Sequence, residues 1–416
     1  MILRARFVCP IAQPPLGNGA VAVAGDRIAA MGGWPDLHTS YPGSTVDLGD
    51  VILLPGLVNA HCHLDYTDLA GLLTRPKAFP DWIKQIVIHK AGWGYSDYAQ
   101  SWLQGAKMLL SSGTTTVADI EAVPELLPQV WEATPLRVIS FLELMNVRSW
   151  SSAGQVVREA EQTLTALPAA RGGVGLSPHA PYTTSPELLR RAAETARRRD
   201  WLLTTHVAES REEFDMFMHR RGALYDWMSG QRDVSQCGAD SPVRHLARQG
   251  VLGRNFIAVH ANYLADGDAR LLAEHGVSVA HCPRSHGYFR HERFPIEPLL
   301  AEGVNVCLGT DSLASVERSR CEPMTLNLFS EMRALAANEP ALSAESLVRM
   351  ATVNGARALR RERELGVLAP EARADLIAIP FQGREADVYE AILNHKRDVS
   401  ASLVGGQWAI PSAALA

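Results

Sequence analysis

The sequence has neither a long run of basic residues nor an apolar stretch near the roughly 20 residues that a membrane-spanning helix needs. Its formal net charge of -5 argues against nucleic acid or an anionic membrane as the main partner. Residues 1–15 lack the apolar core and the small-residue cleavage site of a signal peptide. We therefore expect a cytoplasmic protein whose partner is a small molecule, with no role for membrane or nucleic acid.

Cysteine is scarce, and no two cysteines form a C-x-x-C pair. This spacing predicts neither a disulfide framework nor a zinc ribbon, and it agrees with a reducing compartment. A glycine-rich G-x-G-x-x-G loop after a first strand is also absent, which disfavours a doubly wound dinucleotide-binding sheet. The six cysteines are Cys9, Cys62, Cys237, Cys282, Cys307 and Cys321.

Short β-like runs with turn residues occur at both ends of the chain, as in "STVDLGDVILLPG" and "ADLIAIPF". Between them, eight short apolar runs alternate with helix-like stretches, one of which has Ser185 as N-cap and Pro186 at its first helical position. This alternation predicts an α/β fold, a (β/α)8 TIM barrel with a small β-sandwich built from both termini. We expect the barrel over residues 56–364 and the sandwich over 1–55 and 365–416.

Polar residues close most of these apolar runs, where a parallel barrel has its active site. The first run ends in His61 and His63, which lie two apart and therefore point to one face of a strand. Each such residue alone has a simpler interpretation, as a hydrogen-bonded histidine or a helix-capping carboxylate. Their shared position favours one common site. The later runs end in His179, His206 with Glu209 behind it, His260, His281 and Asp311.

The residue types in this set suit a metal ion. Neutral imidazoles with one carboxylate match Zn²⁺, and Fe²⁺ and Mn²⁺ are the alternatives. A bound divalent metal lowers the pKa of water toward about 7, so the predicted site is hydrolytic. Asp311 would take the proton of the water, His260 would orient the water, and Glu209 would pass protons to the atom under attack. The predicted ligands are His61, His63, His206 and Asp311.

Motifs along the whole chain resemble those of the amidohydrolase superfamily. "TVNGARAL" and "GVLAPEARADLIAI" resemble its closing helix and its return to the β-sandwich, with Ala372 where a glycine is usual. Within the superfamily the chain is similar to the branch of metal-dependent deaminases and chlorohydrolases, including deaminases of aminodeoxyfutalosine and of methylthioadenosine/S-adenosylhomocysteine. The motifs that occur in the family's order are "PGLVNAHCHLD", "HAPYT", "HVAES", "AVHANYL", "AHCPRS" and "LGTDS".

The resemblance implies the same four metal ligands and a hydrolytic deamination. Glu209 would be the proton shuttle to a ring nitrogen, His260 the residue that orients the water, and His179 a substrate contact. Water would replace the amino group of a ring C–NH₂ in an aminated heterocycle, such as an adenine-bearing nucleoside, and ammonia would leave. Hydrolysis of another C–N bond or of a C–Cl bond is the alternative. A non-catalytic binding protein is less favoured, because every expected ligand position is filled.

Lysine is absent between Lys107 and Lys396. Binuclear members of the family usually bridge two metals through a carboxylated lysine on the fourth strand, and here the fourth predicted strand ends in His179. The resemblance therefore implies a single metal per chain. Glu143, which closes the third run, is a carboxylate that could bridge metals, although a pocket or structural role is favoured.

The segment after the histidine pair has the F-x-x-W-I pattern of adenosine-derivative deaminases. Phe79 and Trp82 are expected to line the pocket or to pack beneath it. Methylthioadenosine/S-adenosylhomocysteine deaminases carry a ribose-binding glutamate nine residues after this tryptophan, and here that place falls at Ala91. The departure counts against that specificity.

Further substrate contacts are expected from the seventh strand end and the loop after it. His286 stands where relatives have the asparagine of C-P-x-S-N. In the loop of residues 284–291, Arg284, Arg290 and His291 add positive charge that suits a substrate carboxylate, or belong to a solvated basic loop. His281 is the third expected contact here. Relatives often dimerise, so a homodimer is expected by analogy.

Overall fold

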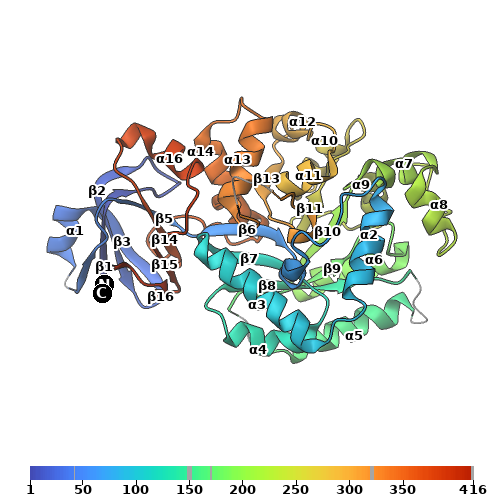
Figure 1. The fold of residues 1–416 in the computed structure, drawn as a ribbon, viewed down its shortest axis with the longest axis horizontal. Helices are drawn as coiled ribbons and strands as arrows, with labels where there is room; N and C mark the ends of the chain where they lie inside the picture. The colour runs from blue at the N-terminus through green and yellow to red at the C-terminus, as the bar shows by residue number, and fades with distance from the viewer. Residues whose placement is uncertain (42, 148–151, 169–170, 319–322, 414–416) are drawn as a thin grey trace.

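The computed structural model describes residues 1–416 except 42, 148–151, 169–170, 319–322 and 414–416. Figure 1 shows a small sheet on one side and a larger barrel surrounded by helices on the other. Both ends of the chain contribute to the small sheet, whose strands lie in the order β16-β15-β14-β5-β1-β2-β3 with β4 beside β1. These strands are β1 (Ile2–Val8), β2 (Leu16–Ala24), β3 (Arg27–Gly33), β4 (Thr45–Asp47), β5 (Val51–Pro55), β14 (Leu376–Pro380), β15 (Ala401–Val404) and β16 (Gln407–Ile410).

The pairing of β5 with β14 joins the two halves of this sheet. The two strands run antiparallel, with Val51 opposite Pro380 and Pro55 opposite Leu376. Both strands are buried along most of their length, and their apolar side chains belong to the main hydrophobic core. The expected small domain from both termini is therefore confirmed, and it is one mixed sheet.

The barrel consists of eight parallel strands in sequence order from β6 to β13. The bridge between Cys62 and Asp311 brings the last strand beside the first, which closes the barrel. Each strand coincides with one of the apolar runs in the sequence, so the expected (β/α)8 fold is confirmed. The domain limits of 1–55, 56–364 and 365–416 stay predictions. The strands are β6 (Leu57–Cys62), β7 (Thr114–Glu121), β8 (Arg137–Leu144), β9 (Gly173–Pro178), β10 (Leu202–Val207), β11 (Phe256–His260), β12 (Ser278–His281) and β13 (Asn305–Leu308).

Helices cover the outside of the barrel (Figure 1). The Ser185 hydroxyl accepts a hydrogen bond from the backbone N–H of Leu188, so the predicted N-cap is present. The first α-helices along the chain are α1 (Trp34–Ser40), α2 (Phe79–Lys90), α3 (Tyr95–Ser111), α4 (Leu127–Glu132), α5 (Ala153–Ala166), α6 (Pro186–Arg199), α7 (Arg211–His219) and α8 (Ala223–Ser229). They continue with α9 (Pro242–Arg248), α10 (Asp268–Glu274), α11 (Pro283–Phe289), α12 (Ile296–Ala301), α13 (Leu328–Asn338), α14 (Ala344–Met350), α15 (Val353–Ala358) and α16 (Val388–Leu393). The short 3₁₀ turns are η1 (Leu64–Leu69), η2 (Pro124–Leu126), η3 (Leu313–Ser315) and η4 (Glu385–Asp387).

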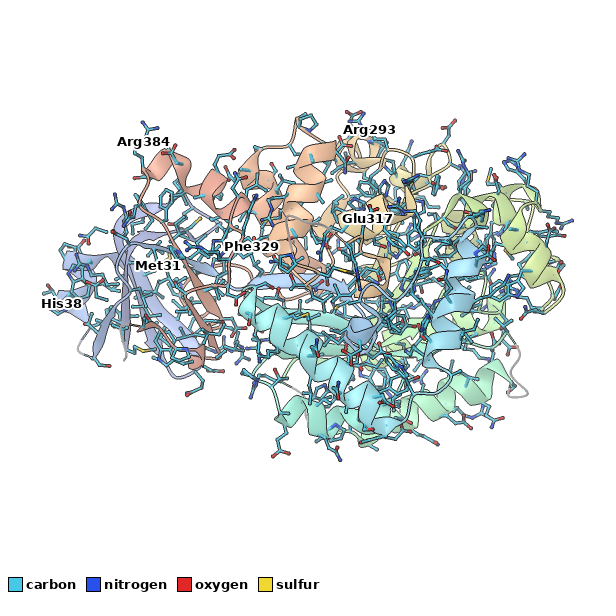
Figure 2. The ribbon with its side chains drawn as sticks, in the orientation of Figure 1. Met31, His38, Arg293, Glu317, Phe329 and Arg384 are labelled. Carbon is cyan, nitrogen blue, oxygen red and sulfur yellow. The ribbon has the colours of Figure 1, made fainter. Side chains whose placement is uncertain are left out.

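One apolar core runs from the small sheet to the outer layer of the barrel. Phe329 on α13 is fully buried in this core and lies between the two parts in Figure 2. Across the described residues, no helix is both long and apolar enough to span a membrane. Five of the six cysteines are free and buried, and Cys321 lies outside the described residues.

Candidate active site

The ends of three barrel strands bring the four predicted metal ligands together. His61 lies in β6 and His63 directly after it, His206 lies in β10, and Asp311 follows β13. All four side chains are buried, with exposed fractions from 1% to 6%. Residues more than a hundred positions apart in the sequence therefore share one enclosed cluster.

The ligand atoms of this cluster face one another. The Nε2 atoms of His63 and His206 are 3.2 Å apart, and Oδ1 of Asp311 lies 3.6 Å from Nε2 of His61 and 3.9 Å from Nε2 of His63. Nε2 of His61 is buried without a hydrogen-bond partner among the described residues. A buried nitrogen that lacks a partner and faces a carboxylate suits coordination of a cation, so the donor set fits a divalent metal.

A hydrogen bond behind His206 fixes the orientation of its ring. Nδ1 of His206 lies 2.8 Å from the carbonyl oxygen of His179 and donates to it in the matching tautomer. That tautomer leaves Nε2 of His206 unprotonated and directed at the cluster, as a metal ligand requires.

Burial governs the protonation of the cluster. Burial and the neighbouring His61 hold the pKa values of His63 and His206 well below the usual range, so both rings are neutral. Burial alone would raise the pKa of Asp311, but the nearby imidazoles of His61, His260 and His63 hold it well below its usual value. Neutral nitrogens beside an ionised carboxylate are the protonation states that bind a divalent cation.

The last strand approaches the first so closely that a side chain at Gly309 has no room. A Cβ there would lie 2.8 Å from both the Cβ and the carbonyl oxygen of His61. The backbone N–H of Asp311 then donates to the His61 carbonyl oxygen at 3.1 Å, with Asp311 at a positive φ of 51°. This strained turn brings the carboxylate back toward the histidine pair.

Glu209 and His260 lie beside the cluster. Nε2 of His260 is 3.7 Å from Oε1 of Glu209, and Glu209, His260 and Asp311 have ligand atoms within 4.8 Å of one another. Burial and the Asp311 charge raise the pKa of Glu209 well above its usual value, which favours the protonated form of its carboxyl. Burial lowers the pKa of His260 to about 3, which keeps its imidazole neutral.

The expected substrate contact His179 reaches the same cluster. Its ring centre is 5.0 Å from that of His206. Nδ1 of His179 lies 2.7 Å from the Thr183 hydroxyl, and burial lowers the pKa of His179 to about 4. A neutral imidazole is thereby fixed at the end of β9.

Helix α2 carries the two predicted aromatic residues. The Trp82 indole N–H donates to the Ala314 carbonyl oxygen at 3.2 Å, and the Phe79 backbone N–H donates to Glu212 at 3.0 Å. Ahead of the helix, Arg75 forms a 2.8 Å ion pair with Glu317, which is labelled in Figure 2. These contacts attach α2 to two segments that follow barrel strands, and leave Phe79 and Trp82 almost fully buried.

The predicted contacts of the seventh strand end divide into two groups. His281 stacks on Phe294 with ring centres 3.7 Å apart, and its ring is 5.3 Å from that of His286. The Arg284 guanidinium instead donates to Glu331 on α13 and to a backbone carbonyl oxygen. The structure therefore directs Arg284 at a buried carboxylate, and its substrate contact stays a prediction without support from this geometry.

Glu143 is on the inner face of β8. Ile139 and Phe141 pack with inner residues of other strands, and alternation places Glu143 on the same face. The carboxyl is half-buried and accepts no hydrogen bond from the described residues. Burial and the nearby Asp65 raise the pKa of Glu143 to about 7.

Three further residues near the cluster were not predicted from the sequence: Lys90, Glu213 and Asn262. Glu213 accepts hydrogen bonds from the backbone of Ala208 and Glu209, and Asn262 donates to the Glu209 carbonyl oxygen. Ser210 and Glu213 have the spacing of a capping box, which predicts that the Glu213 side chain binds backbone N–H groups at the start of a helix. No comparable signal marks the other two.

Comparisons with known proteins find a matching family model and similar sequences. The model of the amidohydrolase family matches residues 52–408. The chain is 31% identical over 421 residues to the 5-methylthioadenosine/S-adenosylhomocysteine deaminase of Moorella thermoacetica, a match that covers 95% of this chain and 88% of the relative. It is 29% identical over 376 residues to the 5'-deoxyadenosine deaminase of Methanothermobacter thermautotrophicus, covering 87% of this chain and 81% of the relative.

A solved structure is similar over almost the full length. The zinc-bound adenosine deaminase of Xanthomonas campestris has a TM-score of 0.84 and 25% sequence identity to this chain. The similarity covers 98% of this chain and 92% of that protein.

Proposed function

Because the chain belongs to the amidohydrolase family, we propose that it is a hydrolytic deaminase of an adenine-bearing nucleoside derivative. The family match and the deaminase-named relatives make it a hydrolase of C–N bonds other than peptide bonds. The named substrates of those relatives are adenosine derivatives. In the proposed reaction, water replaces the amino group on the ring carbon, a C=O group forms, and ammonia leaves.

The observation that carries the proposal is that buried pairwise contacts join His63 to His206 and Asp311 to both His61 and His63, while Glu209 lies beside Asp311 and His260. The four predicted ligands would hold one divalent cation, for which we propose zinc, with Fe²⁺ and Mn²⁺ as alternatives. A bound divalent cation supplies Lewis acidity and lowers the pKa of water. The lysine gap supports a single metal, because no lysine is available on the fourth strand.

Glu209 would move the proton that the ring requires. Burial and Asp311 raise the pKa of its carboxyl, which favours the protonated form that can donate to the ring. It would donate this proton to a ring nitrogen next to the carbon under attack, which makes that carbon more electrophilic. The attacking water would give one proton to Asp311, which would pass it to the departing amino group, and its second proton to the Glu209 carboxylate, which restores the Glu209 carboxyl.

Asp311 and His260 would hold and orient the attacking water. Oδ2 of Asp311 accepts a hydrogen bond from the Ser315 hydroxyl at 3.1 Å, which holds the carboxylate in place to bind the cation and to accept a proton from water. Nε2 of His260 has no partner among the described residues. It is therefore available to hydrogen-bond with water near Glu209.

The substrate ring would lie under α2, against Phe79, Trp82 and His179, and His281 and His286 would contribute the far wall. The rings of Phe79 and Tyr182 are perpendicular with centres 6.4 Å apart, and those of Tyr182 and His179 are perpendicular with centres 5.7 Å apart. Aromatic faces of this kind suit a flat heterocycle. We also propose a cytoplasmic location, because free buried thiols suit a reducing compartment. A homodimer remains a proposal by analogy.

Ammonia release tests the proposal. Purified zinc-loaded protein is assayed with adenosine, 5'-deoxyadenosine and methylthioadenosine, with guanine, cytosine and pterin derivatives as comparison substrates. We expect ammonia and the matching inosine product only from adenine-bearing substrates, and no turnover by Asp311→Asn. Consumption of a substrate without ammonia would favour hydrolysis of another C–N or C–Cl bond. No consumption of any substrate by the metal-loaded protein would contradict an enzymatic role.

A further inference from the structure

Both backbone groups of Glu209 are held by buried side chains. Its N–H donates to Oε2 of Glu213 at 2.9 Å, and its carbonyl oxygen accepts from Nδ2 of Asn262 at 2.9 Å. Glu213 is fully buried and Asn262 is 4% exposed. Since Glu209 lies two residues past the end of β10, no strand partner fixes its backbone.

The Glu209 carboxyl itself makes no hydrogen bond within the described part of the chain. Oε1 of Glu209 lies 3.7 Å from Nε2 of His260, which is beyond hydrogen-bond distance. The position of the Glu209 carboxyl therefore depends on the Glu209 backbone and on the Glu213 and Asn262 side chains that hold this backbone.

Glu213 holds two successive N–H groups. Its second oxygen, Oε1, accepts from the backbone N–H of Ala208 at 3.0 Å. Ala208 has a positive φ of 51°, a conformation that costs a residue with a Cβ of the order of 1 kcal/mol or more. One side-chain carboxyl group that accepts from both N–H groups stabilises this turn. Glu213 is itself fixed in the first turn of α7, where its backbone N–H donates to the Ser210 hydroxyl.

A second hydrogen bond orients the Asn262 amide. Oδ1 of Asn262 lies 3.1 Å from Nδ1 of His286. With the proton on Nδ1, His286 donates to Oδ1, so the NH₂ group of Asn262 must face the Glu209 carbonyl oxygen. The backbone N–H of Asn262 also donates to the Ala208 carbonyl oxygen at 3.0 Å. The strand-end segments after β10 and β11 are thereby joined at the residue before Glu209.

We propose that Glu213 and Asn262, with His286 behind Asn262, are positioning residues that set where the Glu209 carboxyl meets the substrate. This inference rests on the proposed function, in which Glu209 transfers protons. Proton transfer needs heavy atoms about 2.6–3.2 Å apart, and a misplacement of about 1 Å costs up to roughly 100-fold in rate. His286, which stands in place of the usual asparagine, therefore acts through Asn262 on Glu209.

Two variants remove the two sides of this arrangement independently. Glu213→Gln keeps the size of the side chain but replaces one acceptor oxygen by an NH₂ group, which cannot accept from a backbone N–H. Asn262→Ala removes the donor to the Glu209 carbonyl oxygen. In each we expect kcat to fall by about 10- to 100-fold while KM and the metal content change by less than about 3-fold. Asn262→Ala also tests the proposal if Glu213→Gln does not fold.

Asp268→Asn is the matched control. Asp268 is a buried carboxylate that accepts from the backbone N–H of Ala265 and the Ser241 hydroxyl, at the start of α10. Its loss also removes a hydrogen bond to a backbone N–H near a helix start, but at a place that does not touch Glu209. We expect kcat of this variant to stay within about 2-fold of wild type, even where its melting temperature falls as far as that of Glu213→Gln.

A double-mutant cycle separates positioning from general destabilisation. If Glu213 acts through Glu209, Glu213→Gln should reduce the residual rate of Glu209→Gln by less than about 2-fold. An equal loss in both backgrounds would overturn the inference, as would unchanged kcat in folded, metal-loaded Glu213→Gln and Asn262→Ala.

Crystal structures give a readout that needs no substrate. In zinc-loaded Glu213→Gln and Asn262→Ala, the Glu209 carboxyl should be displaced or spread over several positions relative to the wild-type protein. An unmoved carboxyl in both would also overturn the inference. Failure of the proposed function is distinct, because there the wild-type protein releases no ammonia, whereas the crystallographic comparison still decides what holds Glu209.

Discussion

Nζ of Lys90 lies 2.7 Å from Oδ2 of Asp65 and 3.9 Å from the centre of the Tyr66 ring. Lys90 is the last residue of α2, and Tyr66 stacks on His63 with ring centres 4.8 Å apart. A buried ammonium therefore links the helix that carries the predicted substrate contacts to the segment that follows a metal ligand.

Lys90→Met should destabilise the protein by about 3 kcal/mol or more, because it leaves the Asp65 carboxylate buried without its partner. The double variant with Asp65→Asn should recover part of that loss, since no charge then remains unpaired. Urea denaturation measures both. Lys84→Met, which breaks an exposed pair with Asp81, should stay within about 0.5 kcal/mol of wild type. If Lys90→Met and Lys84→Met lowered the free energy of unfolding equally, the buried Lys90–Asp65 pair would contribute no more to stability than an exposed pair.

Glu209→Gln should lower kcat by about 100- to 10,000-fold, because the amide cannot transfer the proton that a carboxyl donates. The bound metal should stay at one per chain by elemental analysis, since the cluster of His61, His63, His206 and Asp311 is intact. A parallel loss of metal would instead identify Glu209 as a ligand.

Removal of the metal should lower the melting temperature, and zinc should restore it. A ligand that binds only the folded state stabilises by about 2.7 kcal/mol at 100 times its dissociation constant. His206→Ala should respond much less to zinc, whereas the exposed His219→Ala should respond like wild type. A chelated wild-type protein whose unfolding ignores added zinc would contradict the metal site.

The stability of the protein should depend on pH through Glu143. Its pKa is raised from 4.5 to about 7 in the folded state, mainly by burial, so the folded protein holds this proton more tightly than the unfolded chain. The stabilisation is fully present below pH 4.5 and is lost as the pH rises through about 7. The free energy of unfolding of wild type minus that of Glu143→Gln should therefore fall across this interval in urea titrations. A constant difference would show that Glu143 has the same pKa folded and unfolded.

The strand ends could be predicted because each candidate ligand closes an apolar run, and parallel strands place such ends at one edge. His61 and His63 are two residues apart, and side chains alternate along a strand, so both were expected on the same face of the sheet. Asp311 closes the last apolar run. Their assignment as metal ligands remains a prediction that rests on this geometry.

The contacts around Glu209 could not be predicted in the same way. Glu213 and Asn262 belong to segments after different strands, and no sequence pattern states which of those segments touch. Arg284 shows the same limit: its partner Glu331 is 47 residues away on α13, so positive charge near the mouth could be read from the sequence but its direction could not.

The pairing of β5 with β14 has a consequence for synthesis on the ribosome. The strand β5, which begins at Val51, can pair with β14 only after the chain has been synthesised as far as Pro380. At about 5–20 residues per second, the intervening chain takes roughly 15–65 s to emerge. Throughout that time one edge of β5 is unpaired and apolar, so the nascent protein is most exposed to misassociation in the interval before its last strands are made.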